Sequence, residues 1–84
     1  MKSSTTPSFR KALAGLPAEI RRLARKNFKL WLYNPRHPSL HFKRIGRFWS
    51  ARVGDDFRAL AMVKGEVIEW FWIGSHAEYD RLLK

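Results

Sequence analysis

The sequence predicts an α+β domain in which two N-terminal helices pack on one face of a small antiparallel β-sheet. Three observations predict it. Apolar residues recur with a helical period through the first half of the chain. Strand-like runs follow in the second half, separated by turns at residues 54–56 and 64–66. The chain has 84 residues, 45% of them hydrophobic, which suffices for the core of one domain spanning residues 1–84.

The N-terminal part is predicted to contain a short strand and two helices. Residues 1–6 can form the strand. Thr6 then caps a first helix, which Pro7 can begin because its fixed φ suits the first helical turn. Gly15 can end that helix. A longer helix is predicted over residues 17–34, up to the Asn-Pro pair that stops it.

The second helix has an apolar face and a basic face. The apolar stripe predicted to enter the core comprises Ile20, Leu23, Ala24, Phe28 and Trp31. The opposite face carries like charges at helical spacing, which weaken an isolated helix. They form either a solvated surface or a binding surface for an acidic partner or an RNA backbone. These cations are Arg21, Arg22, Arg25, Lys26 and Lys29.

Beyond this helix the chain is predicted to be mostly extended. The strand-like runs are joined by short turns, so neighbouring strands should pair as an antiparallel meander. The expected order is β-α-α-β-β-β with a possible short C-terminal helix, and the sheet face away from the two helices is left open. An extended basic segment is expected at residues 40–45, strands at 48–53, 57–63 and 67–73, and the last helix at 77–83.

Positive charge is the most informative bulk property. The net charge is +10, and residues 1–47 carry twelve Lys and Arg against one acid. Such a charge repels itself in a compact domain, so we expect a polyanionic partner such as RNA, the alternative being a surface that serves solubility. The chain has no cysteine, and we expect no disulfide, no metal and no cofactor. We find no secretory signal or bilayer-spanning stretch, so we expect a cytoplasmic protein without a membrane partner.

The predicted turn at residues 54–56 brings two arginines together. If this turn is the loop of a hairpin, Arg52 lies directly opposite Arg58 on one face of the sheet. Two cations in such a pair destabilise a sheet, and an anion bound between the guanidinium groups would relieve the repulsion. Two guanidinium forks match a phosphate well. Alternatively, a nearby carboxylate neutralises the arginines: Asp55, Asp56 or Glu69.

The extended segment and the turn after it carry further basic residues. They could line a groove that binds an RNA backbone, or form a solvated loop. Two cations of the second helix are also candidates for RNA contact. The candidates are His41, Lys43, Arg44 and Arg47, together with Lys29 and Arg25 on the helix.

Polar residues follow directly after the last predicted strand. His76 can shuttle a proton near neutral pH, and Tyr79 can stack on a base or donate its hydroxyl. Either residue could instead be structural. The sequence has no evident catalytic glutamate, and Glu69, the nearest candidate, lies in a strand so apolar that it could also be structural.

Five motifs follow one another along the chain. They are Phe-x-x-x-Leu-x-x-Leu-Pro at residues 9–17, a basic helix ending in Asn34-Pro35, Leu-x-Phe-Lys at 40–43, Ser-x-Arg-x-Gly-x-x-Phe-Arg-Ala-Leu at 50–60, and Ile-Gly-x-His-x-x-Tyr at 73–79. In this order they resemble the RelE/ParE toxin superfamily. The resemblance covers nearly the whole chain and implies a RelE-like fold.

The resemblance also implies a toxin of a bacterial type II toxin–antitoxin pair. RelE-like members enter the ribosomal A site and cut mRNA, whereas ParE-like members inhibit DNA gyrase and cut nothing. His76 and Tyr79 favour a ribosome-dependent, metal-independent mRNA endonuclease, because ParE-like members generally lack such a pair. The alternatives are a non-catalytic gyrase inhibitor and an inactive RNA- or antitoxin-binding module. The implied partners are an acidic cognate antitoxin, mRNA and the ribosomal A site, and the free toxin is expected to be a monomer or weak dimer.

Site roles follow from the same resemblance. Cleavage would be an attack of the ribose 2′-hydroxyl on the adjacent phosphate, which leaves a 2′,3′-cyclic phosphate. Arg52 and Arg58 would hold the scissile phosphate and its developing charge, and Lys43 would add positive charge. His76 or Tyr79 would serve as acid, base or stacking platform, and which residue is the base stays open.

Overall fold

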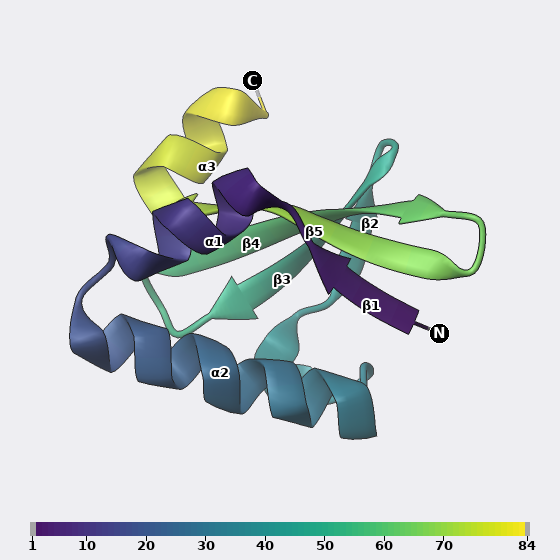
Figure 1. The fold of residues 1–84 in the computed structure, drawn as a ribbon, viewed down its shortest axis with the longest axis horizontal. Coiled ribbons are helices and arrows are strands. Elements are labelled where there is room, and N and C mark those ends of the chain that lie inside the picture. The colour runs from purple at the N-terminus through teal and green to yellow at the C-terminus, as the bar shows by residue number, and fades with distance from the viewer. Residues whose placement is uncertain (1, 84) are drawn as a thin grey trace.

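Five strands form one sheet in the order β1-β5-β4-β3-β2 in the computed structural model, which describes residues 2–83 (Figure 1). Met1 and Lys84 lie outside the described residues. Met1 is the first residue of the strand expected at residues 1–6. Within them the fold is α+β, so the predicted fold class is confirmed. The elements are β1 Lys2–Thr5, α1 Pro7–Ala14, α2 Ala18–Tyr33, the 3₁₀ turn η1 Pro38–Leu40, β2 Lys43–Ile45, β3 Phe48–Val53, β4 Phe57–Lys64, β5 Val67–Ser75 and α3 His76–Leu82.

The sheet is mixed, with one parallel edge strand. β3, β4 and β5 form the predicted antiparallel meander, in which tight turns join neighbouring strands. β2, in the segment expected only to be extended, adds a further antiparallel strand beside β3. β1 instead runs parallel to β5, with Lys2 beside Val67. Two helices and three strands separate β1 from β5 in the sequence, so no hairpin turn forces an antiparallel pairing between them. The parallel edge departs from the purely antiparallel sheet that the sequence predicts.

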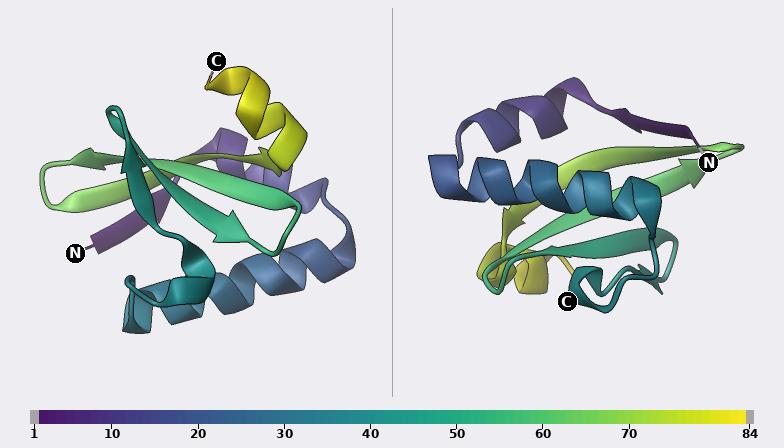
Figure 2. Two further views of the ribbon diagram at one scale, coloured as in Figure 1. Left: turned by 180° about the vertical axis from the view of Figure 1, so that it is seen from behind. Right: turned by 90° about the horizontal axis from the view of Figure 1, so that it is seen from below.

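α1 and α2 both lie on one face of the sheet, as predicted (Figure 2, right). α1 begins as its sequence indicates, since the Thr6 hydroxyl accepts a hydrogen bond from the Phe9 N–H at 3.0 Å and Pro7 opens the helix. Apolar residues of both helices pack on the inward side chains of β3, β4 and β5. Ala61, at the centre of this face, is 0% exposed.

Aromatic rings fill the core near the end of α2. Trp31 is buried and makes edge contacts with Phe42 and Trp70, at ring-centroid distances of 5.7 and 5.6 Å. Phe42 in turn stacks on Trp49 at 4.8 Å. Each such pair contributes about 0.5–1.5 kcal/mol beyond the area it buries. These contacts tie α2 and the segment before β2 to the sheet.

Phe28, a member of the predicted apolar stripe, is not in the core. It is 40% exposed at the edge of α2, although its ring stacks on that of Trp31. Asn27 faces the sheet instead, where its side-chain amide donates to the Arg52 carbonyl at 3.2 Å. Neighbouring helical residues point about 100° apart, so only one of the two can face the sheet. The hydrogen bond to Arg52 favours Asn27 at the sheet-facing position. Apolar periodicity does not reveal this bond.

α3 covers part of the sheet face opposite to α1 and α2 (Figure 2, right). A capping box starts it: Ser75 Oγ accepts from the Glu78 N–H, and Glu78 Oε1 accepts from the Ser75 N–H, both at 3.1 Å. Tyr79 then packs beside Trp72, with ring centroids 6.5 Å apart. The predicted last helix is therefore confirmed. The face expected to be open is covered by this helix next to the C-terminal end of β5. Among the described residues, the remainder of that face carries no helix.

Candidate functional site

Strand pairing identifies the side chains that share a face of the sheet. Residues paired directly across two strands point to the same side, and successive residues alternate. Arg52 pairs with Arg58, as the sequence predicts. Their neighbours Ala51 and Ala59 lie in the core under the helices, so both arginines point to the opposite face. We call Arg52 and Arg58 the arginine pair.

Arg52 is held by the turn between β3 and β4. Its Nε donates to the Gly54 carbonyl at 3.1 Å, and its Nη2 forms a close ion pair with Asp55 Oδ1. The alternative considered from the sequence, neutralisation by a nearby acid, therefore applies to Arg52. The Asp55 side chain is 86% exposed, and an ion pair this open to solvent is worth about 0–1 kcal/mol. A bound anion can replace Asp55 at low cost.

Arg58 forms no ion pair with any carboxylate of residues 2–83. Its Nη1 donates instead to three backbone carbonyls of the same turn, those of Phe57 at 2.7 Å, Asp55 at 3.3 Å and Gly54 at 3.4 Å. Carbonyl oxygens orient the guanidinium group but do not cancel its charge. The arginine pair thus keeps uncompensated positive charge on the face away from the helices.

Helix α2 fixes the turn that holds the arginine pair. Gly54 has a φ of +66°, and a Cβ at this position would lie 2.6 Å from Leu23 Cδ2. The positive φ favours glycine here, and any larger residue would also force the Leu23 side chain to shift. Asn27, on the same helix, binds the Arg52 carbonyl. The turn that joins the two strands of the arginine pair is therefore packed against α2, whereas the two guanidinium groups lie on the other side of the sheet.

His76 lies beside the same turn. Its backbone N–H donates to the Asp56 carbonyl at 2.7 Å, so the first residue of α3 adjoins the arginine pair's loop. Its Nδ1 lies 3.1 Å from Asp80 Oδ2, one helical turn further on. A carboxylate that accepts the Nδ1 proton leaves Nε2 available as a base. Sequence reasoning missed Asp80, although its i,i+4 spacing from His76 was a usable signal.

Tyr79 is less available than the sequence suggests. It is 8% exposed, with its ring beside Trp72 and 6.1 Å from the His76 ring. Trp72 also occupies the space above Gly74, where a Cβ would lie 2.6 Å from the indole ring. Gly74 pairs with Arg58, so this indole lies next to the arginine pair. Tyr79 anchors α3 on the sheet, and the exposed residue of the predicted pair is His76.

The glutamates near the site are engaged elsewhere. Glu69 is salt-bridged to Lys64 at 2.9 Å, and it pairs with Met62, four residues along β4 from Arg58. That separation is about 13 Å along a strand. The Ser75 backbone N–H, followed by its hydroxyl, holds the pKa of Glu78 below its ordinary value. Glu78 is thus committed to capping α3.

Lys43 is the basic residue of β2 that shares the face of the arginine pair. It pairs with Ser50, which lies two residues before Arg52 on β3. Diagonal neighbours of this kind are about 7–8 Å apart. Its side chain is exposed and can reach toward an anion held by the arginine pair.

The other predicted RNA-binding residues do not gather at this site. Arg44 alternates with Lys43 and points to the opposite side of β2. Arg47 lies in the β2–β3 turn, about 17 Å from Arg52 along β3. The remaining candidates are separate: His41, exposed with a φ of 43° after η1, and Arg25 and Lys29, which α2 carries on the other side of the sheet.

The described residues contain neither a cluster of metal ligands nor a membrane-spanning helix. No group of three or more His, Cys, Asp and Glu side chains among residues 2–83 is placed to hold a metal ion. In the same range, no helix combines the length and the apolar character needed to cross a membrane.

Solved structures share this fold over nearly the whole chain. A chain of the RelB–RelE antitoxin–toxin complex from Methanococcus jannaschii has a TM-score of 0.73 at 18% identity, covering 95% of this chain and 98% of that chain. A chain of the archaeal RelE–RelB complex from Pyrococcus horikoshii OT3 has a TM-score of 0.65 at 23% identity, with 88% and 92% covered. The isolated E. coli RelE toxin has a TM-score of 0.65 at 14% identity, with 96% and 94% covered. No protein-family model matches the sequence, and neither does any curated protein.

The protein thus belongs to the class of small basic α+β domains that carry two helices on one face of a sheet and an arginine pair on the other. Within that class it has the fold of RelE-type toxins. The RelE-like fold implied by the sequence motifs is confirmed.

Proposed function

We propose that this protein is the toxin of a type II toxin–antitoxin pair and acts as a ribosome-dependent, metal-independent mRNA endonuclease. The observation that carries the proposal is the arginine pair, which lies beside His76 on a face of the sheet away from α1 and α2. The likeness to solved RelE structures supports it, since these are RelE toxins, one isolated and two in complexes with RelB antitoxins.

The reaction proposed for this site is transfer of a phosphate within the RNA itself. His76 Nε2 takes the proton of a ribose 2′-hydroxyl, whose oxygen bonds to the adjacent phosphorus while the bond to the 5′-oxygen breaks. The leaving oxygen takes a proton from the Lys43 ammonium or from water. The products are a 2′,3′-cyclic phosphate and a 5′-hydroxyl end. The nucleophile belongs to the substrate, so this reaction does not require a metal to supply one.

The arginine pair is proposed to stabilise the charge that develops on phosphorus. Fixed donors aimed at such charge lower the barrier without reorganising during the reaction. Asp80 is proposed as a positioning residue that binds Nδ1–H of His76 and leaves Nε2 free. Tyr79 is proposed to hold α3 against Trp72, because its ring is buried there.

The proposed partners follow from charge and from the comparisons. Two of the similar structures are RelB–RelE complexes, and a chain of net charge +10 is suited to an acidic antitoxin. The proposed targets are mRNA and the ribosomal A site. The protein would therefore act in the cytoplasm.

Growth of bacteria that express the protein tests this function. Wild type is compared with Arg58→Ala and His76→Ala, and with Lys26→Ala as a matched loss of one exposed cation on α2. Wild type and Lys26→Ala should arrest growth and leave cellular mRNA cut within codons. Arg58→Ala and His76→Ala, with unchanged circular dichroism, should do neither.

Two other results would overturn the proposal in different ways. Growth arrest with DNA damage and intact mRNA would assign the chain to gyrase inhibitors. Full expression of folded wild-type protein without any growth arrest would leave an inactive RNA- or antitoxin-binding module.

A further inference from the structure

Two phenylalanine rings meet on the face of the sheet away from α1 and α2. Phe48 precedes Trp49 and Ala51, which both pack in the core on the helix-bearing face, so alternation points Phe48 to the opposite face. The ring of Phe71 on β5 contacts that of Phe48, with centroids 5.2 Å apart and planes at 54°. We call Phe48 and Phe71 the aromatic pair. Both side chains are half-buried, so part of each ring is open to solvent.

A β-bulge turns Phe71 to this face. The register between β4 and β5 shifts at this point and leaves Phe71 without a partner on β4. Trp70 and Ile73 both lie in the core, although an unbroken alternation would place residues three apart on opposite faces. The bulge therefore sends both intervening residues, Phe71 and Trp72, to the face of the arginine pair. Bulges that re-aim side chains in this way are over-represented next to active sites.

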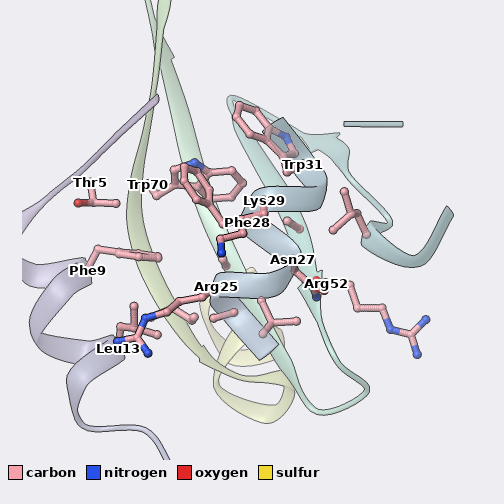
Figure 3. A pocket seen from close by; sticks show the side chains of 16 residues that line it. Thr5, Phe9, Leu13, Arg25, Asn27, Phe28, Lys29, Trp31, Arg52 and Trp70 are labelled. Atoms are coloured by element: carbon pink, nitrogen blue, oxygen red, sulfur yellow. The ribbon is translucent and has the colours of Figure 1, made fainter. Parts of the chain in front are cut away.

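The aromatic pair and the arginine pair belong to one continuous surface. Phe48, Ser50 and Arg52 follow one another on the same side of β3, so Phe48 lies about 13 Å from Arg52 along the strand. The guanidinium group of Arg52 points away from the apolar groove beneath α2 (Figure 3). Ser50 and its partner Leu60, which lie between the two pairs, are each 2% exposed. Larger side chains thus close over the middle of this face, which forms a platform and not a cleft.

The charge around this platform indicates an anionic occupant. Arg58 has no carboxylate partner among the described residues, and Lys43 is exposed on the same face. Glu69, two residues before Phe71, is neutralised by Lys64 at 2.9 Å. Proteins bind single-stranded nucleic acid with this combination of side chains, because bases stack on aromatic rings while phosphates bind cations. An apolar protein segment would cover the rings but leave the cations without partners.

We propose that the aromatic pair is a platform on which an unpaired base of the RNA stacks while the arginine pair holds the scissile phosphate. The distance of about 13 Å along β3 spans about four nucleotides at the stacked spacing of about 3.4 Å, and fewer in an extended strand. The stacked base therefore belongs to the strand that is cut, a few nucleotides from the cut. The inference rests on the RNA substrate of the proposed function and deepens it, since stacking fixes the register of the strand without requiring one particular base.

Two oligonucleotides separate base stacking from phosphate binding on the intact protein. The first is a fluorescently labelled 2′-O-methyl RNA, which cannot be cleaved. The second is an abasic strand of the same length and charge. Fluorescence anisotropy gives the Kd of each. Wild type should bind the strand with bases at least about fivefold more tightly, because one stacked base contributes that factor or more.

Substitutions on the two faces assign this preference to the aromatic pair. Phe48→Leu and Phe71→Leu keep most of the apolar volume but remove a ring, so each should lower the preference, and the double variant should abolish it. Phe71→Tyr keeps the ring and should preserve the preference. Phe28→Leu, which removes a 40% exposed ring of α2, is the matched control and should also preserve it. Arg58→Ala should weaken both strands by the same factor, because it removes only phosphate binding.

Several results would overturn the platform. They are equal binding of the two strands by wild type, an unchanged preference in the folded double variant, or loss of the preference in Phe28→Leu. If the double variant does not fold, the single variants decide. Self-association of the free chain that Phe71→Leu abolishes would assign this face to a second copy.

The platform and the nuclease can fail separately. Loss of the platform leaves the nuclease standing, because the growth test with Arg58→Ala and His76→Ala does not depend on a preference for bases. A failed growth test with the preference intact leaves an RNA-binding module that carries the platform.

Discussion

Single residues decide how much charge the site offers to an anion. Arg58 donates only to carbonyl oxygens, whereas Arg52 also binds the carboxylate of Asp55. Asp55 thus occupies one donor of the arginine pair that a phosphate would use. Asp56, its neighbour, forms no ion pair among the described residues and contributes its backbone carbonyl to His76. The two acids of one turn therefore differ in their effect on the site.

Replacing Asp55 with Asn should strengthen RNA binding. An exposed ion pair is worth about 0.2–1 kcal/mol, so the Kd of a 2′-O-methyl RNA should fall by up to about fivefold. Asp56→Asn changes the net charge equally and is the matched control. Fluorescence anisotropy measures both. The same change of Kd in the two variants would show that net charge alone matters and that Asp55 does not occupy the site.

Replacing Asp80 with Asn should slow cleavage through His76. A positioned base contributes about 10²–10⁴-fold to the rate, and we expect the loss of its orienting carboxylate to cost at least about tenfold. The cleavage rate of ribosome-bound mRNA measures this. In a His76→Ala background the same change should have no further effect, because the two residues act as one unit. A tenfold loss in both backgrounds would contradict the role of Asp80.

At the scale of elements, α3 depends on its capping box. Hydrogen bonds from the Ser75 N–H and hydroxyl hold the pKa of Glu78 below the ordinary value of 4.5. A lowered pKa means that this contribution to stability is fully present above pH 4.5 and is lost as the pH falls through the folded-state pKa. The cap therefore links the position of His76 to the ionised state of Glu78.

Replacing Glu78 with Gln should remove the pH-dependent contribution of the capping box to the free energy of unfolding. The difference in free energy of unfolding between wild type and Glu78→Gln should be constant above pH 4.5 and shrink below it. Urea denaturation at a series of pH values measures the difference. A difference that stays constant down to strongly acidic pH would contradict the ionised cap.

The contact between α2 and the β3–β4 turn can be tested with two glycines. Gly54 and Gly65 have φ values of +66° and +62°, but only Gly54 has an atom, Leu23 Cδ2, within 4 Å of a would-be Cβ. Gly65→Ala should cost about 1–2 kcal/mol, the price of a left-handed conformation. Gly54→Ala should cost more, because Leu23 must also move. Urea denaturation compares them, and equal losses would contradict the packing of α2 on this turn.

At the scale of the whole molecule, most of the fold could be predicted from local patterns. Turn residues and strand-like runs predicted the meander, and this was sufficient to pair Arg52 with Arg58. The parallel edge β1 could not be predicted, because no turn specifies its partner. Phe28 was misplaced because periodicity does not register the hydrogen bond that turns Asn27 to the sheet.

The site could be predicted only in part, because local sequence patterns do not specify all the contacts between its elements. Cross-strand pairing predicted that Arg52 and Arg58 share one face of the sheet. The register between β2 and β3 places Lys43 on that same face. The segregation of Arg44 from Lys43 follows from the same alternation and was overlooked. The burial of Tyr79 depends on Trp72, which lies seven residues earlier on β5, and helical spacing does not predict that contact.

The two faces of the molecule carry different kinds of positive charge. On one face the arginine pair flanks the β3–β4 turn, and Lys43 of β2 lies diagonally across from Arg52. On the other face Arg25 and Lys29 line an apolar groove beneath α2. Cations that contribute to the net charge of +10 thus lie on both faces of the sheet.

Mapping of mRNA ends in a cell-free translation reaction tests the central claim most directly. Purified wild-type protein should produce 5′-hydroxyl ends within the codon at the ribosomal A site, with 2′,3′-cyclic phosphates on the upstream fragments. A folded Arg52→Ala/Arg58→Ala double variant should produce none. Cleavage by the double variant at the wild-type rate, or uncut mRNA with the wild-type protein, would contradict the assignment of the arginine pair to the scissile phosphate.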